Sequence, residues 1–528
     1  MFRTVSREMA LLAVFSFVTL STGCRKHPQA VTTYHYDNLR TGWNREEEEL
    51  TYKKVHSARF GLLKNVTLDD QVDTQPLLVP HVDIPTGPSP GVHDVVYVAT
   101  EGNTIYAIDA SSGQILLNPK FGNPVPTPLG CGNNGPNVGI NGTPVIDHET
   151  RTMFVIIYTL EAGTPIYRLH GLDLSSLTDK IPPVVVSASH KLTNGTMFQF
   201  NAKYQRQRPA LLLSKGNVYA GFGSFCDFAA NVSRGWLLGW KQDTLAPLAA
   251  NQLDDTQATS PDSFFLSSIW MSGYGLAADP EGNIYFITGN SDYSGTTYDG
   301  ATSIQESVVK VAGDLSKVLD LFTPSNQGNL DQTDEDFGSA GALLLPPQEG
   351  GTPHLIAAAG KDGRMFILNR NNMGGYTPGG PDKFVTQADI GGCWCGQSYF
   401  HHKIVSSGGS KAILWKVQTS PMVVLQNQGS SAGIGGGQDP GFFTSISSDD
   451  EDHPIIWAVS RPDNSSPADI SLFAFKGEPS SSATLDTLFH AQAGTWPNTG
   501  GNANIVPVVA NGKAYVASYK QLSIFGMH

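Results

Sequence analysis

Short apolar runs separated by turn residues recur along most of this chain. Residues 336–373 show the plan clearly, with apolar runs at 340–345, 354–359 and 364–368 that are separated by Gly-, Pro- and Asp-containing turns. Runs of this length with such boundaries are typical of antiparallel strands. Apolar and polar positions alternate only weakly within the runs, which predicts strands that are covered on both faces.

The same plan is found eight times, with a mean spacing of about 60 residues, which suits propeller blades with inserted loops. The eight units are residues 74–117, 141–177, 207–245, 270–322, 336–373, 399–424, 444–488 and 504–526. A rival interpretation is an irregular β-helix, but the short coil period of that fold is absent. The repeats therefore predict an all-β fold, a β-propeller of about eight blades.

The last unit is short, and a strand candidate at residues 60–68 could complete it. Pairing of the N-terminal and C-terminal strands would close the ring and remove exposed sheet edges. The predicted organisation is a signal peptide at residues 1–23, an N-terminal extension at 24–59, and a propeller at 60–528.

Composition supports this class and excludes others. The 528 residues include 56 Gly and 33 Pro, and only 15% are charged, which argues against a helical bundle or a disordered chain. The net charge of -13 and the absence of a Lys/Arg run argue against nucleic acid as a partner.

The N-terminus has the features of a secretory signal. Arg3 and Arg7 precede a short apolar core at residues 9–20, which is too short for a stable membrane span. Cys24 follows Gly23, as at a bacterial lipoprotein cleavage site. We therefore expect an exported protein that is periplasmic, anchored to a membrane by a lipid on Cys24, or secreted.

Four cysteines remain after the signal, an even number that suits disulfides in an exported chain. Cys131 and Cys226 both lie in Gly-containing loops, which favours a bridge between them. Cys393 and Cys395 form a C-x-C, close for a mutual bridge but able to make one. A zinc site is the alternative, although no second C-x-C or H-x-H is present.

Residues 97–117, YVATEGNTIYAIDASSGQILL, carry a family resemblance. They are similar to the blade repeat of the pyrroloquinoline-quinone (PQQ) dehydrogenase-like propeller superfamily, in which a strand and a Gly/Asn turn lead into Y-A-x-D-x-x-S/T-G. The likeness extends over nearly the whole mature chain and implies the propeller fold. It does not by itself imply an activity, because one fold serves many functions.

Four local segments resemble the active site of those dehydrogenases. The resemblance implies that Asp336 (in TDEDFGSAG) is the catalytic base, and that Lys361 (in GKDGRMFILNR) contacts the quinone oxygens. It implies that Asn290 (in YFITGNSDY) and Asp227 (in GSFCD) are calcium ligands. The implied cofactors are PQQ and calcium, whose chemistry suits oxygen ligands, a carboxylate base and a cation beside the reduced quinone.

Two further residues are candidates for cofactor binding. Trp270 could stack on a planar ligand, as the floor tryptophan of those enzymes does, or it could belong to the core. Arg208 opens an inner strand and would face the propeller axis, where it could bind a ligand or form an internal ion pair. Lys361, Asp336 and Asn290 lie in polar turns, and simple solvent exposure is the alternative for each.

The chain also departs from the enzyme pattern. The two adjacent cysteines of those dehydrogenases are replaced by the single Cys131, the Trp of the blade-docking signature is missing after Gly113, and no C-x-x-C-H haem-attachment motif is present. Two functions therefore remain: a binding or scaffold module of the cell envelope, with envelope proteins or a small molecule at the channel mouth, and a PQQ- and calcium-dependent dehydrogenase of alcohols or sugars. Without the cofactor site, no cofactor is expected.

Overall fold

The computed structural model describes residues 28–132, 135–295, 297–434, 439–462, 467–497 and 503–528. The predicted signal peptide and Cys24 lie outside the described residues. Within the described ranges, no helix is long and apolar enough to cross a membrane.

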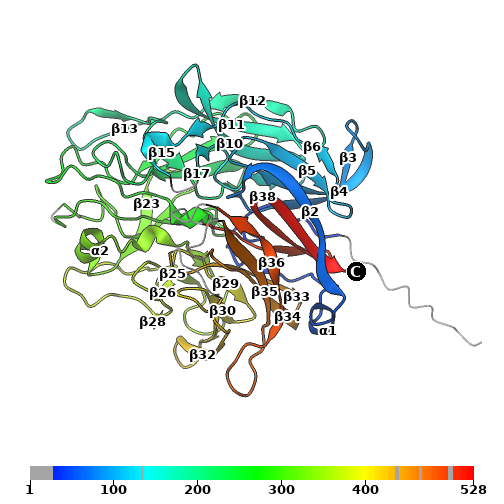
Figure 1. Ribbon diagram of the computed structural model, residues 1–528. Coiled ribbons are helices and arrows are strands. Elements are labelled where there is room, and N and C mark those ends of the chain that lie inside the picture. The colour runs from blue at the N-terminus through cyan, green and yellow to red at the C-terminus, as the bar shows by residue number, and fades with distance from the viewer. Residues whose placement is uncertain (1–27, 133–134, 296, 435–438, 463–466, 498–502) are drawn as a thin grey trace, which may run out of the picture.

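Eight small antiparallel sheets follow one another around a ring, so the predicted eight-bladed β-propeller is confirmed (Figure 1). Each blade is a meander in which the first strand lies nearest the axis. Blade one contains β3 (Leu77–Ile84), β4 (Gly91–Ala99), β5 (Ile105–Asp109) and β6 (Ile115–Leu117), and blade two contains β9 (Val145–Asp147), β10 (Thr152–Glu161), β11 (Thr164–Asp173) and β12 (Asp179–Val185). Blade three contains β15 (Gln205–Gln207), β16 (Leu212–Ser214), β17 (Asn217–Ser224), β18 (Trp236–Lys241) and β19 (Gln252–Leu253). Blade four contains β20 (Ala277–Ala278), β21 (Ile284–Ile287), β22 (Val308–Val311) and β23 (Val318–Thr323), with β27 (Gly375–Tyr376) added in parallel.

Blades five to eight complete the ring. Blade five contains β24 (Leu343–Leu344), β25 (Leu355–Ala359), β26 (Arg364–Asn369) and β28 (Thr386–Asp389), and blade six contains β29 (Ser398–Phe400), β30 (Lys403–Ser406), β31 (Ile413–Gln418) and β32 (Val424–Ser430). Blade seven contains β33 (Phe443–Asp449), β34 (Asp452–Val459), β35 (Ala468–Lys476) and β36 (Thr487–Trp496), with β1 (Trp43–Asn44) in parallel. Blade eight contains β37 (Val508–Ala510), β38 (Lys513–Met527) and β2 (Phe60–Gln71).

The remaining elements lie in loops between these strands. They are the hairpins β7 (Val125–Pro126) with β8 (Asn137–Val138) and β13 (Ser189–Lys191) with β14 (Met197–Gln199), the helices α1 (Tyr52–Val55) and α2 (Gln327–Thr333), and the 3-10 turns η1 (Pro128–Gly130), η2 (Met271–Gly273) and η3 (Phe337–Ser339).

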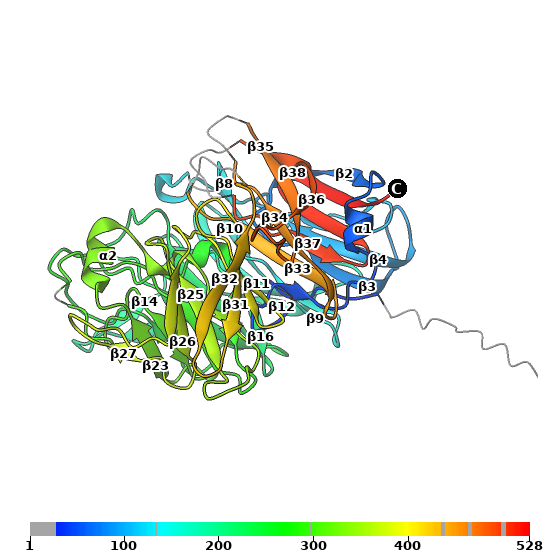
Figure 2. The same cartoon turned by 90° about the horizontal axis from the view of Figure 1, so that it is seen from below.

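The ring closes as the sequence predicted. In blade eight, β38 pairs with β2 from Phe60↔Met527 to Gln71↔Tyr519, with register shifts after Leu62 and after Thr67, and an earlier part of β38 pairs with β37. The strands β2, near the start of the described chain, and β38, at its end, therefore lie side by side, as both views show (Figures 1 and 2). Blade eight consequently has no open edge where its N-terminal strand meets its C-terminal strands.

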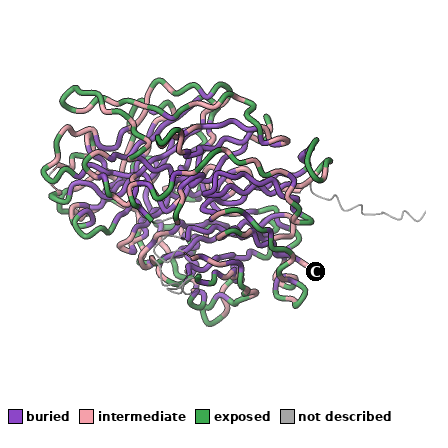
Figure 3. Tube along the Cα trace, turned by 45° about the horizontal axis from the view of Figure 1, so that its top comes forward, coloured by how far each residue is buried: buried purple, intermediate pink, exposed green. Residues whose placement is uncertain are grey.

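The blades pack face to face, which explains the weak alternation of apolar and polar residues. Every residue of β21 (IYFI) and of β25 (LIAAA) is buried, because each sheet has a neighbour on both faces. Buried residues follow the strands, and exposed residues gather in the outer loops (Figure 3).

The structure adds one feature that the sequence analysis did not foresee. Residues 31–44, which we call the axial segment, hydrogen-bond to the inner strands of all eight blades. From blade one to blade eight, the pairs are Val31–Leu78, Thr32–Ile146, Asn38–Leu213, Asn38–Ala278, Leu39–Leu344, Thr41–Tyr399, Gly42–Ile446 and Asn44–Val509. The segment therefore passes around the axis once, in the order of the blades.

Tyr274 connects the axial segment to the blades. Its hydroxyl donates to the carbonyl oxygens of Arg40 (2.9 Å) and Gln397 (3.1 Å). The ring fits between two glycines: a Cβ at Gly341 would lie 1.8 Å from the ring, and one at Gly396 would lie 2.0 Å from it. Glycine is required at both positions because any larger residue would overlap the ring.

Candidate functional site

A cavity of about 460 Å³ lies at the other end of the axis from the axial segment. Arg208, Trp270 and Asp336 line the cavity. Five to eight residues later, the same stretches of chain bond to the axial segment, at Leu213, Ala278 and Leu344. The inner strands therefore run from the cavity toward the axial segment. The lining residues are Arg206, Arg208, Ser224, Cys226, Asp227, Phe228, Trp270, Asp334, Asp336, Lys361, Trp394 and Asp439. Five of the six predicted site residues are among them.

Lys361 and Asp336 form a buried ion pair in this cavity. The Lys361 Nζ lies 2.6 Å from Asp336 Oδ2 and 3.1 Å from Asp334 Oδ1. Burial raises the pKa of Asp336, but the charge and hydrogen bond of Lys361 lower it more, so the net pKa lies below the ordinary value. Burial lowers the pKa of Lys361, yet the charges of Asp336 and Asp334 outweigh it and raise that pKa. Both groups are therefore charged at neutral pH.

Asn290 is joined to the same pair, although it does not line this cavity. Its backbone N–H donates to Asp336 Oδ1 (2.6 Å), and its side-chain Nδ2 donates to Asp334 Oδ1 (3.2 Å). Gly289 allows this approach, because a Cβ there would lie 2.5 Å from Asp336 Oδ1 and 2.8 Å from Trp270 Nε1. With Asp227, Asn290 lines an adjoining pocket of about 430 Å³.

Asp227 lies three residues after the C-terminal end of β17 and lines both pockets. Ser224 Oγ donates to its Oδ1. Burial, and then the negative charge of Asp336, raise the pKa of Asp227 to about 6. Burial and the neighbouring carboxylate therefore both favour the protonated form of Asp227.

Two more buried carboxyls lie behind Asp336. Burial and the charge of Asp336 raise the pKa of Asp331 to about 8. Burial, together with the charges of Asp336 and Asp331, raises the pKa of Glu306 well above its ordinary value. Asp331 accepts from the Ser291 N–H (2.9 Å), and Glu306 accepts from the Phe337 N–H (2.5 Å), so these two acids hold the loops that carry Asn290 and Asp336.

Two tryptophans and an arginine shape the rest of the cavity. The Lys361 Nζ lies 5.6 Å from the ring centroid of Trp270 and 5.2 Å from that of Trp394. The guanidinium carbon of Arg208 lies 5.6 Å from the Trp270 centroid. Cations so placed are attracted to the ring faces. The cavity therefore combines aromatic surface with both signs of charge.

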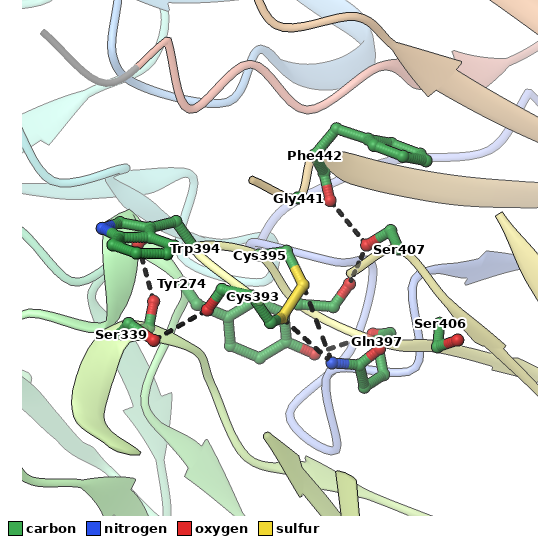
Figure 4. The surroundings of a disulfide bond; sticks show 12 residues. Tyr274, Ser339, Cys393, Trp394, Cys395, Gln397, Ser406, Ser407, Gly441 and Phe442 are labelled. Carbon is green, nitrogen blue, oxygen red and sulfur yellow. Dashed lines mark hydrogen bonds between the residues drawn. A yellow bond between two sulfur atoms is a disulfide. The ribbon is translucent and has the colours of Figure 1, made fainter. Parts of the chain in front are cut away.

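Trp394 is held between two bonded cysteines. Cys393 and Cys395 form a disulfide, with Tyr274 and Gln397 beside it (Figure 4). The Gln397 Nε2 lies 3.4 Å from the Cys393 Sγ, and Ser339 Oγ donates to the Cys393 carbonyl (2.7 Å). The bridge is present although only one residue separates the cysteines, and it restrains the backbone from which Trp394 enters the cavity.

The other bridge joins Cys131 to Cys226, as the sequence favoured. Because Cys226 lines the cavity and precedes Asp227, the bridge ties the loop after blade one to the wall of the site. With all four cysteines in disulfides, the zinc alternative is excluded.

The residues present fit an organic cofactor better than a metal ion alone. Aromatic faces and buried guanidinium nitrogens without protein partners, at Arg206 and Arg208, suit a planar anion. Asp227 and Asn290 offer the oxygen ligands that calcium prefers. Among the described residues, no group of three or more His, Cys, Asp or Glu is arranged to hold a metal, so a calcium ion would need further oxygens from a ligand or water.

Sequence reasoning missed four residues of the site: Arg206, Asp334, Trp394 and, behind the cavity wall, Arg461. Arg206 carried a signal, because it lies two positions before Arg208 and alternation on a strand directs both side chains to the same face. Arg461 and Trp394 follow no motif, and only the fold brings them here.

No protein-family model matches this sequence, and no curated protein matches it significantly. Solved structures do resemble it in fold. The quinohemoprotein alcohol dehydrogenase from Comamonas testosteroni is 13% identical (TM-score 0.61; 94% of this chain and 80% of that chain are covered). A quinohemoprotein alcohol dehydrogenase from Pseudomonas putida HK5 is 13% identical (TM-score 0.62; 95% and 81%).

A europium-containing methanol dehydrogenase is 12% identical, with a TM-score of 0.57 and coverage of 95% of this chain and 99% of that chain. The chain thus has the eight-bladed propeller fold of the quinoprotein alcohol dehydrogenases. At this identity, the likeness establishes the fold alone.

Proposed function

We propose that this protein is a quinone-dependent, calcium-assisted dehydrogenase that oxidises alcohols or sugars. The observation that carries the proposal is convergence: Asp336 and Lys361 of blade five and Asp227 of blade three line one cavity, and Asn290 of blade four is bonded to Asp336. Scattered turn residues with no common role would not be expected to meet in this way.

Each residue has a task in this chemistry. When bound, the quinone supplies a two-electron acceptor and calcium supplies polarising charge. Asp336 takes the proton of the substrate hydroxyl as the carbon gives up a hydride, so that the alcohol becomes a carbonyl compound. Each Asp336 oxygen keeps a lone pair beyond its bond to Lys361 or to the Asn290 amide, so it can accept this proton. Lys361 keeps Asp334 as a second partner when it turns toward a ligand.

The same residues assign the cofactor positions. Asp227 and the side-chain oxygen of Asn290 would bind calcium, while Lys361, Trp270 and Arg208 would contact the quinone. Bound calcium would compensate the negative charge that raises the pKa of Asp227.

Titration of the purified mature protein with PQQ and calcium tests this proposal, followed by dye reduction with simple alcohols and sugars. Calcium-dependent PQQ binding is expected, and Asn290→Ala and Lys361→Ala should abolish it. Lys411→Ala removes an exposed lysine and serves as the control. If the wild-type protein fails to bind PQQ at high micromolar concentration with calcium present, the dehydrogenase proposal is wrong.

The second candidate is a binding or scaffold module of the cell envelope. The replacement of the adjacent cysteine pair by the Cys131–Cys226 bridge favours it, because the enzyme resemblance places that pair against the cofactor. Two disulfides also support our proposal that the protein is exported, with or without a lipid on Cys24. Absence of PQQ binding, with a partner recovered from envelope extracts and lost when the cavity mouth is mutated, would favour this candidate.

A further inference from the structure

Three arginines near the cavity are buried without enough hydrogen-bond partners. Arg206, Arg208 and Arg461 are 3%, 4% and 3% exposed. Among the described residues, Arg206 Nη2, Arg208 Nε and Nη2, and Arg461 Nη1 have no hydrogen-bond partner. A buried N–H group without a partner, above all on a charged group, is costly, so such atoms normally have a partner in the functional state.

Arg40 shows how this chain treats an arginine with a structural role. It is fully buried in the axial segment, and each of its guanidinium nitrogens is bonded. Nε donates to Leu276 O (2.7 Å), Nη1 to Thr33 Oγ1 (2.7 Å) and Nη2 to Leu211 O (3.2 Å). Among the described residues, Arg234, which is buried away from the cavity, has an unpaired Nε but a fully bonded Nη1, so Arg208, with two unpaired nitrogens, is the least paired of these arginines.

The three arginines come from opposite sides of the ring. Arg206 and Arg208 belong to blade three, whereas Arg461 follows β34 of blade seven and donates to Gly441 O (2.5 Å) and Trp394 O. Burial, and then the charge of Arg206, lower the pKa of Arg208 to about 9, and the charge of Arg461 acts in the same direction. Arg206 and Arg208 line the cavity, and Arg461 bonds to the backbone of Trp394 in its opposite wall.

The nearby carboxyls do not pair with these nitrogens. Arg206 Nε donates to Asn141 Oδ1 (3.0 Å), whose Nδ2 donates to Glu101 Oε1 (2.6 Å). Burial raises the pKa of both Asp73 and Glu101, and these carboxyls hydrogen-bond to each other, as a pair that holds one proton does. Asp439 lines the cavity and acts on Arg208 and Arg461 through its charge, but it leaves their unpaired nitrogens unpaired. The three arginines therefore keep N–H groups without a protein partner in the described part of the chain.

We propose that Arg206, Arg208 and Arg461 form a binding site for an organic dicarboxylate on the propeller axis. A guanidinium presents its N–H groups in a planar fork that matches a carboxylate. Unpaired nitrogens on both sides of the axis suit two carboxylates better than one. Trp270, which Arg208 approaches at 5.6 Å, provides the apolar surface for the body of the ligand.

The site requires neither a redox reaction nor calcium, so it is tested on the purified mature protein without quinone. Calorimetric titration uses malonate as the probe, with inorganic phosphate at the same concentration for comparison. Malonate is expected to bind more tightly than phosphate. Arg208→Gln should weaken malonate at least about tenfold, because two charged hydrogen bonds are lost. Arg208→Lys, which keeps the charge but not the fork, should weaken it less.

Arg45→Gln is the matched control, because Arg45 is exposed and far from the cavity, and malonate should bind to it as to wild type. Arg461→Gln should also weaken malonate; since Arg461 bonds to two loop carbonyls, its circular dichroism spectrum must first match that of wild type. The proposal is overturned if malonate fails to bind at millimolar concentration, if phosphate binds more tightly, or if Arg208→Gln binds malonate as wild type does.

A second titration, with PQQ at saturation, identifies the molecule that carries the carboxylates. Competition with malonate means that they belong to the cofactor, and simultaneous binding means that they belong to the substrate; both support the site. Malonate binding that depends on Arg208, in a protein that does not bind PQQ, would sustain this inference while refuting the proposed dehydrogenase.

Discussion

Replacement of Arg208 by methionine should stabilise the ligand-free protein. Methionine is similar in length and carries no charge, and the Arg208 Nε and Nη2 have no partner to lose. Most substitutions at a buried position destabilise a protein, so a gain would be unusual and would mark a position retained for binding rather than for stability.

The magnitude follows from the pKa of Arg208. Burial, and then the charge of Arg206, lower this pKa from the ordinary value of an arginine to about 9, a fall of more than three units. At about 1.4 kcal/mol per pKa unit, the folded state is disfavoured by about 5 kcal/mol when Arg208 is charged. The variant also loses the cation–π contact with Trp270, which reduces this gain in stability by about 2 kcal/mol. Arg208→Met should therefore raise the free energy of unfolding by about 3 kcal/mol at pH 7.5.

Urea titration followed by tryptophan fluorescence measures this difference, and pH provides an internal check. Between about pH 9 and the ordinary pKa of arginine, the unfolded chain binds more protons than the folded one, so wild-type stability rises with pH in that range. The advantage of Arg208→Met should be complete below pH 9 and should shrink at pH 10. Malonate should stabilise wild type and leave Arg208→Met unchanged.

Two variants serve as controls. Arg45→Met, at an exposed position, should change stability little, whereas Arg40→Met should be strongly destabilising because it leaves several carbonyl oxygens without donors. If Arg208→Met is less stable than wild type at pH 7.5 by more than about 1 kcal/mol, Arg208 is a structural residue and the charge argument is refuted.

Three further predictions concern the cavity and its supports. Asp336→Asn should lower alcohol-dependent dye reduction about a hundred- to ten-thousandfold while PQQ still binds, because a general base is lost; unchanged turnover would exclude Asp336 as the base. Trp394→Ala should weaken PQQ about tenfold by fluorescence titration and Trp394→Phe should weaken it less, and equal affinity in all three proteins would show that no ring stacks there. The double variant Cys131→Ser/Cys226→Ser should lower the free energy of unfolding by about 2 to 5 kcal/mol, since the bridge spans 95 residues of sequence; no change in the urea midpoint would contradict this.

The convergence of Asp336, Asn290 and Lys361 could be anticipated from the sequence because it follows from strand order. In each blade, residues just before the first strand and just after the second strand lie at the same end of the axis. Asp336 precedes β24, whereas Asn290 follows β21 and Lys361 follows β25. Because every blade repeats this arrangement, residues in these two positions lie together at the end of the axis where the cavity is.

Other features depend on tertiary packing that no local pattern reveals. Arg461 looks like any charged residue after a strand, and only the closed ring brings it near the cavity, where its charge acts on Arg208. The axial segment has few apolar residues and no strand-like run, because its backbone groups and two Asn side chains bond to eight separate blades rather than to one neighbouring strand. Periodicity reports regular pairing and therefore does not detect such a segment.

The axial segment has a consequence for the order of assembly. It is among the first parts of the chain to be synthesised, yet its last partner, Val509, is nearly the last. An incomplete set of blades cannot provide hydrogen-bond partners for all the polar groups of residues 31–44. In a nascent or truncated chain, some of these groups must therefore remain bonded to water until the ring is complete. Loss of the final hairpin should therefore affect the centre of the molecule as much as its edge, and the protein should fold as one cooperative unit rather than blade by blade.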